Sequence, residues 1–186
     1  MPPTDWLAET ARQRPEAPAV VARDGTLTYA QLDARASKLA ERLAEHGIAP
    51  GEPVGALLPP LAESVVVVHA VARLGAVLVP FNLRLTTDEL AWQITHVGAR
   101  FVVVAGGEAP TLPVGVEAIG REAWTEGRRD ASHPSPLAPR SSLHDVQAVL
   151  FTSGTSGRPK GALLTFDNHF WSAMASALRI GMLPDD

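Results

Sequence analysis

A ten-residue run in the last quarter of the sequence contains the residue types best suited to chemistry. It holds three glycines, four hydroxyl side chains and two cations, in the order Thr152-Ser153-Gly154-Thr155-Ser156-Gly157-Arg158-Pro159-Lys160-Gly161. Glycine lets a backbone approach a ligand closely, and successive N–H groups in such a turn form an anion-binding concavity. Hydroxyl groups donate to phosphate oxygens, and Lys160 adds a mobile positive charge. The run therefore predicts a loop that cradles a polyphosphate, and the alternative is an ordinary glycine-rich hairpin turn.

This pattern differs from the P-loop of kinases and GTPases. That loop has glycine directly before its lysine and serine or threonine directly after it, and it opens a helix whose dipole helps to hold the phosphate. Here Pro159 precedes Lys160 and Gly161 follows it. The apolar runs 146–151 and 162–166 flank the loop, so we expect it to join two strands. Phosphate binding would then depend on backbone N–H groups, hydroxyls and Lys160, without a helix terminus.

Apolar segments earlier in the chain alternate with capped helices. We expect strands at 54–58, 77–80 and 101–104, separated by helices at 63–74 and after Thr86. The pairs Thr28 with Gln31 and Thr86 with Glu89 fit capping boxes, and Asp24-Gly25 is a hairpin signal between strands 19–23 and 26–29. Continuous apolar strands alternating with helices are typical of a parallel sheet covered on both faces. The sequence therefore predicts an α/β fold, although the β-branched run at 65–68 would suit a strand better than a helix.

Changes in composition and in the hydrophobic pattern divide the chain into three parts. Residues 1–105 carry the βα alternation and are expected to form an N-terminal α/β subdomain. Residues 106–145 are rich in glycine and proline, which predicts a surface excursion or linker with one weak strand at 114–119. Residues 146–186 are expected to form a strand, the phosphate loop, a second strand and a helix.

Composition excludes several classes of protein. The 186 residues are 46% hydrophobic and 19% charged, which is typical of a folded domain. The absence of cysteine excludes disulfide bonds, thiolate zinc sites and a cysteine nucleophile. A net charge of −4 gives no overall attraction to nucleic acid or anionic membranes. No apolar run approaches the ~20 residues of a membrane span, and the start lacks the order of a signal peptide, so we expect a cytoplasmic protein.

The histidines do not predict a metal site. Five of the six are scattered along the chain without the spacing of metal ligands, at His69, His96, His133, His144 and His169. We expect surface or helix histidines, with His169 as a partial exception for the reason given below.

The loop 152–161 resembles the signature loop of the adenylate-forming superfamily, which includes acyl- and aryl-CoA ligases, luciferases and peptide-synthetase adenylation domains. Two further segments resemble the same family, namely Leu27-Thr28-Tyr29-Ala30-Gln31-Leu32 and Leu74-Gly75-Ala76-Val77-Leu78-Val79-Pro80-Phe81-Asn82. Most members have a histidine where this chain has Phe166. The run 165–173 (TFDNHFWSA) instead resembles the "TFGNHxxSA" of o-succinylbenzoate–CoA ligases of menaquinone synthesis. The alternative is an amphipathic helix with an aromatic patch.

The resemblance implies an enzyme that joins a carboxylate to ATP with Mg²⁺, releases pyrophosphate, and passes the acyl group to CoA. It implies that Thr152, Ser153, Gly154, Thr155, Ser156, Gly157 and Lys160 hold the ATP phosphates. Lys160 would neutralise charge on the leaving pyrophosphate. It also suggests His169 and Ser172 as contacts of the carboxylate substrate, best guessed as 2-succinylbenzoate.

Enzymes of this family are much longer than 186 residues. We therefore expect the N-terminal portion of a ligase, with little or no activity by itself and an exposed apolar face through which it dimerises or self-associates. Two alternatives remain open at this point: a ligase for another aryl or fatty acid, and a non-catalytic nucleotide-binding module.

Overall fold

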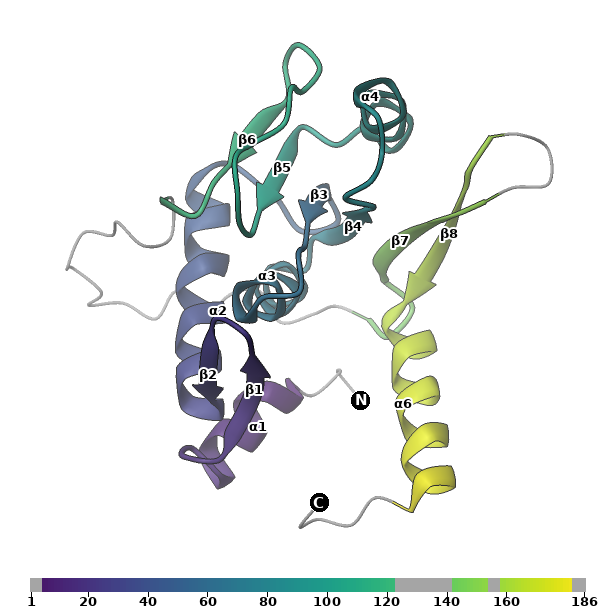
Figure 1. Cartoon of the computed structure of the whole chain (residues 1–186). Coiled ribbons are helices and arrows are strands. Elements are labelled where there is room, and N and C mark those ends of the chain that lie inside the picture. The colour runs from purple at the N-terminus through teal and green to yellow at the C-terminus, as the bar shows by residue number, and fades with distance from the viewer. Residues whose placement is uncertain (1–4, 123–141, 154–157, 182–186) are drawn as a thin grey trace.

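The computed structural model describes residues 5–122, 142–153 and 158–181, and its strands and helices alternate from the second strand to the fifth (Figure 1). In chain order they are α1 (Trp6–Gln13), β1 (Pro18–Ala22), β2 (Gly25–Thr28), α2 (Tyr29–Glu45), β3 (Pro53–Leu57), α3 (Ala62–Leu74), β4 (Val77–Phe81), α4 (Thr87–Val97), β5 (Phe101–Val104), β6 (Glu117–Ile119), β7 (Val146–Thr152), β8 (Lys160–Thr165) and α6 (Phe166–Ile180). None of the described helices is long and apolar enough to cross a membrane.

The main sheet has six strands in the order β6-β5-β3-β4-β7-β8. Its neighbours pair in parallel from β6 to β7, and β8 pairs antiparallel with β7 at one edge. The predicted parallel strands β3, β4 and β5 are confirmed at the centre. Strands β1 and β2 form a separate antiparallel hairpin, as the Asp24-Gly25 signal predicted. The architecture is therefore α/β, with a mixed sheet because of its last strand.

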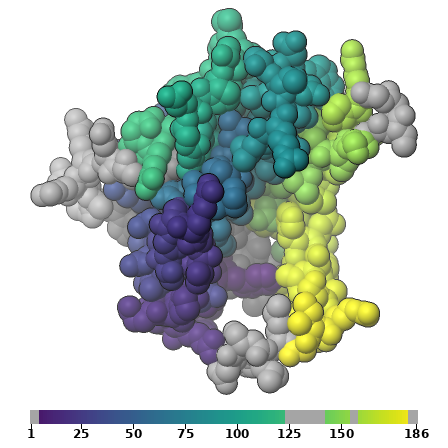
Figure 2. All heavy atoms as spheres, in the orientation of Figure 1, coloured from purple at the N-terminus to yellow at the C-terminus, as the bar shows by residue number. Residues whose placement is uncertain are grey.

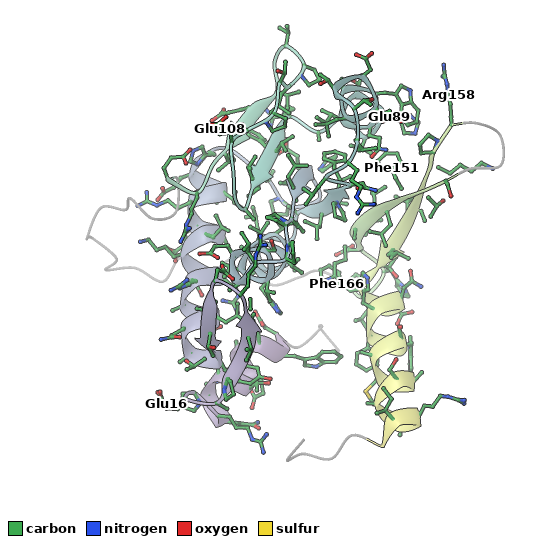
Figure 3. All side chains as sticks on the ribbon, viewed as in Figure 1. Glu16, Glu89, Glu108, Phe151, Arg158 and Phe166 are labelled. Atoms are coloured by element: carbon green, nitrogen blue, oxygen red, sulfur yellow. The ribbon has the colours of Figure 1, made fainter. Side chains whose placement is uncertain are left out.

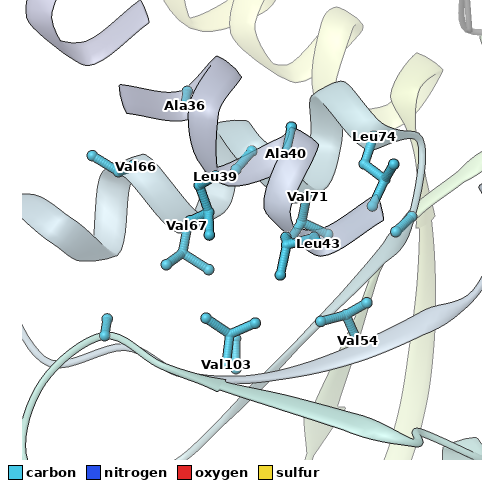
Figure 4. Packing of buried hydrophobic residues seen from close by; sticks show 14 of the residues in the cluster. Ala36, Leu39, Ala40, Leu43, Val54, Val66, Val67, Val71, Leu74 and Val103 are labelled. Carbon is cyan, nitrogen blue, oxygen red and sulfur yellow. The ribbon is translucent and has the colours of Figure 1, made fainter. Parts of the chain in front are cut away.

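Helices cover both faces of this sheet, as predicted. On one face α2 and α3 pack over β3 and β5, with side chains that lose all or nearly all contact with water (Figure 4): Leu39, Leu43, Val66, Val67, Val71, Val54 and Val103. On the other face α4 supplies Leu90 and Ile94, which pack with Val79, Val102 and Val104. Burial on both faces explains why the central strands are apolar at every position.

Burial also decides the conformation of α3. Its β-branched run at 65–68, which intrinsically favours a strand, forms about one turn of helix because Val66, Val67 and Val71 all fall on the face turned to α2 and the sheet. Gly75 ends the helix in the left-handed conformation at φ 77°. The predicted helix is therefore confirmed, and the free energy of packing outweighs the propensity of these valines.

Two details of the prediction were wrong. Phe166 is not the last residue of a strand but the first of α6, because Thr165 caps that helix in a third capping box with Asn168. The side chain of Phe166 is buried at the junction with β8. The weak strand expected at 114–119 is confined to β6, since Val114 and Gly115 lie in a turn before it. The proposed division at 106–145 includes residues 123–141, which lie outside the described residues, and it stays a prediction.

Arg73 joins the three N-terminal helices. From α3 its guanidinium donates to the Asp5 carboxylate, which also caps α1, over 2.9 Å. It donates to the Asp33 carboxylate of α2 over 2.7 Å and to the Ser37 hydroxyl over 2.6 Å. Burial opposes the charge on Arg73, but the hydrogen bonds to Asp5 and Asp33 outweigh it and raise its pKa. The charge is thus buried together with its partners, which makes this cluster specific to one arrangement of the helices.

The capping box of α4 predicts an acid-sensitive contribution to stability. The Thr86 N–H and hydroxyl donate to Glu89 over 2.8 and 2.9 Å, and these two hydrogen bonds lower the pKa of Glu89 below its ordinary value of 4.5. A lowered pKa in the folded state adds stability above the unfolded value, and this is lost as the pH falls below it. We expect Glu89→Gln to be less stable than the original protein at pH 7, with a difference that shrinks below pH 4.5. Urea unfolding at pH 7 and pH 3 measures this.

The neighbouring Asp88→Asn is the matched control, because Asp88 lies in the same first turn but makes no capping-box contact. The effect of Asp88→Asn on the free energy of unfolding should change less with pH than that of Glu89→Gln. A Glu89→Gln difference that stays constant from pH 7 to pH 3 would contradict the assignment.

Candidate phosphate-binding site

The predicted strand–loop–strand is confirmed as the β7–β8 hairpin. Antiparallel pairing places Phe151 opposite Gly161 and Thr152 opposite Lys160, so the two ends of the loop meet. The Thr152 hydroxyl donates to the Lys160 carbonyl over 3.4 Å, a long hydrogen bond across this last pair. Sequence reasoning therefore placed the loop between the right two strands, because both are apolar and the loop between them is not, but the strands extend further into the predicted loop, to Thr152 and from Lys160.

The end of β7 lies at the carboxyl edge of the parallel sheet. Since β7 runs parallel to β4, its last residue Thr152 points the same way as the ends of β3, β4 and β5. In open α/β sheets ligands bind in crevices beyond this edge, where loops and not strands shape the surface. The hairpin therefore carries its hydroxyls and cations to the usual position of a ligand site.

The described loop residues are open to solvent. Thr152, Ser153, Arg158 and Lys160 are all exposed, and the Arg158 side chain extends from the tip of the hairpin (Figure 3). No described acidic side chain pairs with Lys160. The other predicted phosphate contacts, Gly154, Thr155, Ser156 and Gly157, lie outside the described residues. What the structure does describe is a hydroxyl–lysine pair beside a second cation, an arrangement that can bind an anion arriving from solvent.

The structure does not bring His169 and Ser172 to this loop. Both lie on α6, which begins where β8 ends, and the remaining five residues of β8 separate α6 from Lys160 by about 20 Å of strand. Ser172 is exposed, whereas His169 Nδ1 lies 2.7 Å from the Gln147 amide oxygen at the start of β7. These two residues are therefore too far from Lys160 to contact the phosphates that Lys160 is predicted to contact.

His169 instead borders an apolar cleft of about 230 Å³. Its walls come from α3, β4 and β7, with Ala72, Leu78 and Ala148 among the apolar lining and Gln147 beside His169 as the polar part. Sequence reasoning missed Gln147, because 22 residues separate it from its partner and no local pattern links them.

Sequence reasoning also missed a cluster of three aromatic rings beside the loop. Phe151 of β7 lies against Trp92 and His96 of α4, with ring centroids 6.1 and 6.2 Å away. An aromatic residue directly before the loop was the available signal, but its partners are more than 50 residues earlier in the sequence.

Comparison with known proteins gives a consistent result. A family profile described as AMP-binding enzyme matches residues 7–186. The 2-succinylbenzoate–CoA ligase of Geobacillus kaustophilus is 37% identical over 185 residues, which cover 96% of this chain and 36% of that enzyme. The chain thus spans just over a third of the length of the curated relatives it matches.

Solved structures are similar over the whole chain. The o-succinylbenzoate CoA synthetase of Bacillus subtilis in complex with its acyl-adenylate intermediate has a TM-score of 0.85 and 31% identity, over 100% of this chain and 48% of that one. The same synthetase in complex with ATP and magnesium ion has a TM-score of 0.83 and 30% identity, over 100% of this chain and 49% of that one.

Proposed function

The chain belongs to the family of AMP-binding enzymes, and from this premise we propose that it supplies the phosphate-binding part of an ATP-dependent carboxylate–CoA ligase. The observation that carries the proposal is the β7–β8 hairpin, which sets Thr152 against Lys160 at the carboxyl edge of the sheet. The proposed acid is 2-succinylbenzoate, on the support of relatives such as the Geobacillus kaustophilus ligase. Because the chain spans only part of those relatives, the activity is proposed for the enzyme that contains these residues.

In the proposed reaction a carboxylate oxygen attacks the α-phosphorus of ATP, and the bond from that phosphorus to the bridging oxygen breaks. The products of this step are the acyl-adenylate and pyrophosphate. The thiol of CoA then attacks the acyl carbon, loses its proton, and displaces AMP. Charge accumulates on the departing pyrophosphate, so cations and donors held beside it lower the barrier of the first step.

The hairpin would act on that pyrophosphate. Thr152 and Ser153 offer hydroxyl donors and Lys160 a positive charge, and all three are exposed on the loop side of the hairpin. Gly154, Thr155, Ser156 and Gly157 complete the proposed contact through backbone N–H groups and hydroxyls. Mg²⁺ binds largely through substrate phosphates in such sites, which fits a loop whose described side chains are hydroxyls and cations.

We propose His169 and Ser172 as contacts of the acid. His169 borders the apolar cleft, whose aliphatic walls suit an aromatic ring, and Gln147 holds its imidazole over 2.7 Å. Ser172 follows one helical turn later on α6. The distance of this cleft from Lys160 requires that the two sites bind different parts of the reacting molecules.

The decisive test of the function uses Lys160→Ala in the enzyme that contains these residues. We expect acid-dependent ATP–pyrophosphate exchange to fall about 100-fold or more, by analogy with removal of one oxyanion-stabilising donor. The free energy of unfolding should change by no more than about 0.5 kcal/mol, as for other surface substitutions. Exchange with 2-succinylbenzoate, benzoate and a fatty acid identifies the acid, and urea unfolding of each variant measures stability.

Lys38→Ala is the matched control, since Lys38 is the other lysine of the sequence and lies exposed on α2. It should leave exchange unchanged. Unchanged exchange in Lys160→Ala, or a loss explained wholly by unfolding, would refute the role of Lys160. Intact adenylation with slower CoA transfer would move Lys160 to the second step.

The role of His169 makes a separate prediction. His169→Ala should raise the KM for the acid several-fold in the exchange assay and leave the KM for ATP within twofold. Asn168→Ala is not a suitable comparison because Asn168 caps α6, so the exposed Ser176 of the same helix, as Ser176→Ala, serves as the control. Equal changes in both KM values would argue that His169 supports the hairpin and does not contact the acid.

We further infer that the chain self-associates through α6. Trp171, Met174 and Leu178 lie on one face of this helix, and Trp171 and Leu178 are 64% and 79% exposed. The helix runs along the edge of the molecule in Figure 2. A second copy of the chain could cover this face symmetrically, and the small net charge of −4 opposes that association only weakly.

Light scattering over a hundredfold range of concentration tests this inference. The mass should rise toward that of a dimer or larger species, and Leu178→Lys should shift the rise to higher concentration. Leu83→Lys, at an exposed leucine outside α6, should not. A monomer at all concentrations would show that α6 does not mediate association between copies.

A further inference from the structure

The hairpin that carries the loop has little support from the sheet near its tip. Within the described residues, the register of β7 on β4 pairs Leu78 with Ala148. From Val149 to Thr152 the strand pairs with β8. A two-stranded ribbon is only marginally stable in water by itself, so the loop needs another contact to hold its position.

Phe151 provides that contact. Side chains alternate along β7, so Val149 and Phe151 share the face toward α4, while Leu150 and Thr152 share the other. Val149 is buried and Phe151 packs at the edge of the same cluster (Figure 3). Phe151 is thus the last side chain of β7 that touches the body of the protein before the loop begins.

Its partners are two rings of α4. Trp92 and His96 stand one helical turn apart and stack with centroids 4.8 Å apart and planes 16° from parallel. Phe151 meets Trp92 edge-on at 62°, with centroids 6.1 Å apart, and lies 6.2 Å from His96. All three separations are within the 4.5–7 Å range in which aromatic pairs attract one another.

The helix that presents these rings is itself firmly held. Its capping box fixes the first turn, Leu90 and Ile94 are buried against the sheet, and Gly98 ends it in the left-handed conformation. On the other strand of the hairpin Gly161 faces Phe151, and a Cβ there would lie 3.0 Å from a methyl of Val149. Since β8 contributes no side chain at this pair, α4 supplies the support for Phe151.

We propose that Trp92, His96 and Phe151 form an aromatic bracket that positions the phosphate loop relative to the sheet. All three are positioning residues that act through Thr152 and the loop. The inference rests on the proposed function for its effect on catalysis, but the bracket itself is a statement about the hairpin. A displacement of about 1 Å in a group that contacts the reacting atoms costs on the order of 100-fold in rate, so small shifts of the hairpin would matter.

Amide hydrogen exchange on the chain tests the bracket without any ligand. Trp92→Ala and Phe151→Ala should speed exchange two- to tenfold in β7 and β8 near the loop, as expected for the loss of one aromatic pair. Exchange in β3 and β5 should not change. Trp92→Phe and Phe151→Tyr keep an aromatic ring at each position, so amide exchange in these variants should stay slow. Trp171→Ala, at the exposed tryptophan of α6, is the control and should leave amide exchange in β7 and β8 unchanged.

If Trp92→Ala unfolds the chain, His96→Ala replaces it, because His96 is exposed and its removal leaves the core intact. Unaltered exchange in β7 and β8 in all of these variants would overturn the bracket, whatever the function of the loop.

Pyrophosphate exchange by the enzyme that contains these residues separates the bracket from the proposed function. We expect Trp92→Ala to lower kcat at least tenfold with the KM for the acid unchanged. Trp92→Phe should retain most of the original kcat. If Lys160→Ala slows pyrophosphate exchange and Trp92→Ala does not, the proposed bracket is wrong and the proposed phosphate site is supported. If Lys160→Ala leaves pyrophosphate exchange unchanged, while Trp92→Ala speeds amide hydrogen exchange in the hairpin, the bracket is supported and the assignment of the loop is wrong.

Discussion

The rest of the site depends on the pairing of β7 with the edge of the parallel sheet. β7 runs parallel to β4 on one side and antiparallel to β8 on the other, so it is the strand at which the direction of the sheet reverses. Parallel pairing sends the end of β7 to the carboxyl edge, and antiparallel pairing returns the chain at once. A loop between the two must project beyond that edge, with Thr152 and Lys160 at its base.

The sheet can serve as this support because both of its faces are buried. Valines and leucines of α2 and α3 cover one face, and α4 covers the other. At roughly 25 cal/mol per Å² of apolar surface removed from water, such packing outweighs local preferences of about 0.7 kcal/mol or less per residue. This is why the valines of α3 form a helix. The Arg73 cluster then ties α1, α2 and α3 together by directional hydrogen bonds, which apolar packing alone does not provide.

The side chains of the candidate site are distributed along the β7–β8 hairpin and the start of α6. Hydroxyls and cations stand at its tip, an aromatic contact with α4 supports its middle, and His169 with Gln147 lies at its base beside the apolar cleft. A molecule with a charged phosphate end and a separate aromatic end would match this distribution. The order of these parts follows from the chain path, since α6 starts where β8 ends and continues away from the loop (Figure 1).

The sequence by itself determined the features that depend on neighbouring residues. The capping boxes at Thr28 and Thr86, the apolar strands and the polar loop between β7 and β8 are all local patterns, and so is the family signature in that loop. Only the tertiary structure decided the features that depend on distant segments. Strand order and the helical state of α3 both follow from which surfaces are buried together. The meeting of Phe151 with Trp92 and His96, and of His169 with Gln147, has the same origin. Such contacts leave no periodic trace in a single sequence, because the chain between the partners can take many paths and the free energy of packing selects one.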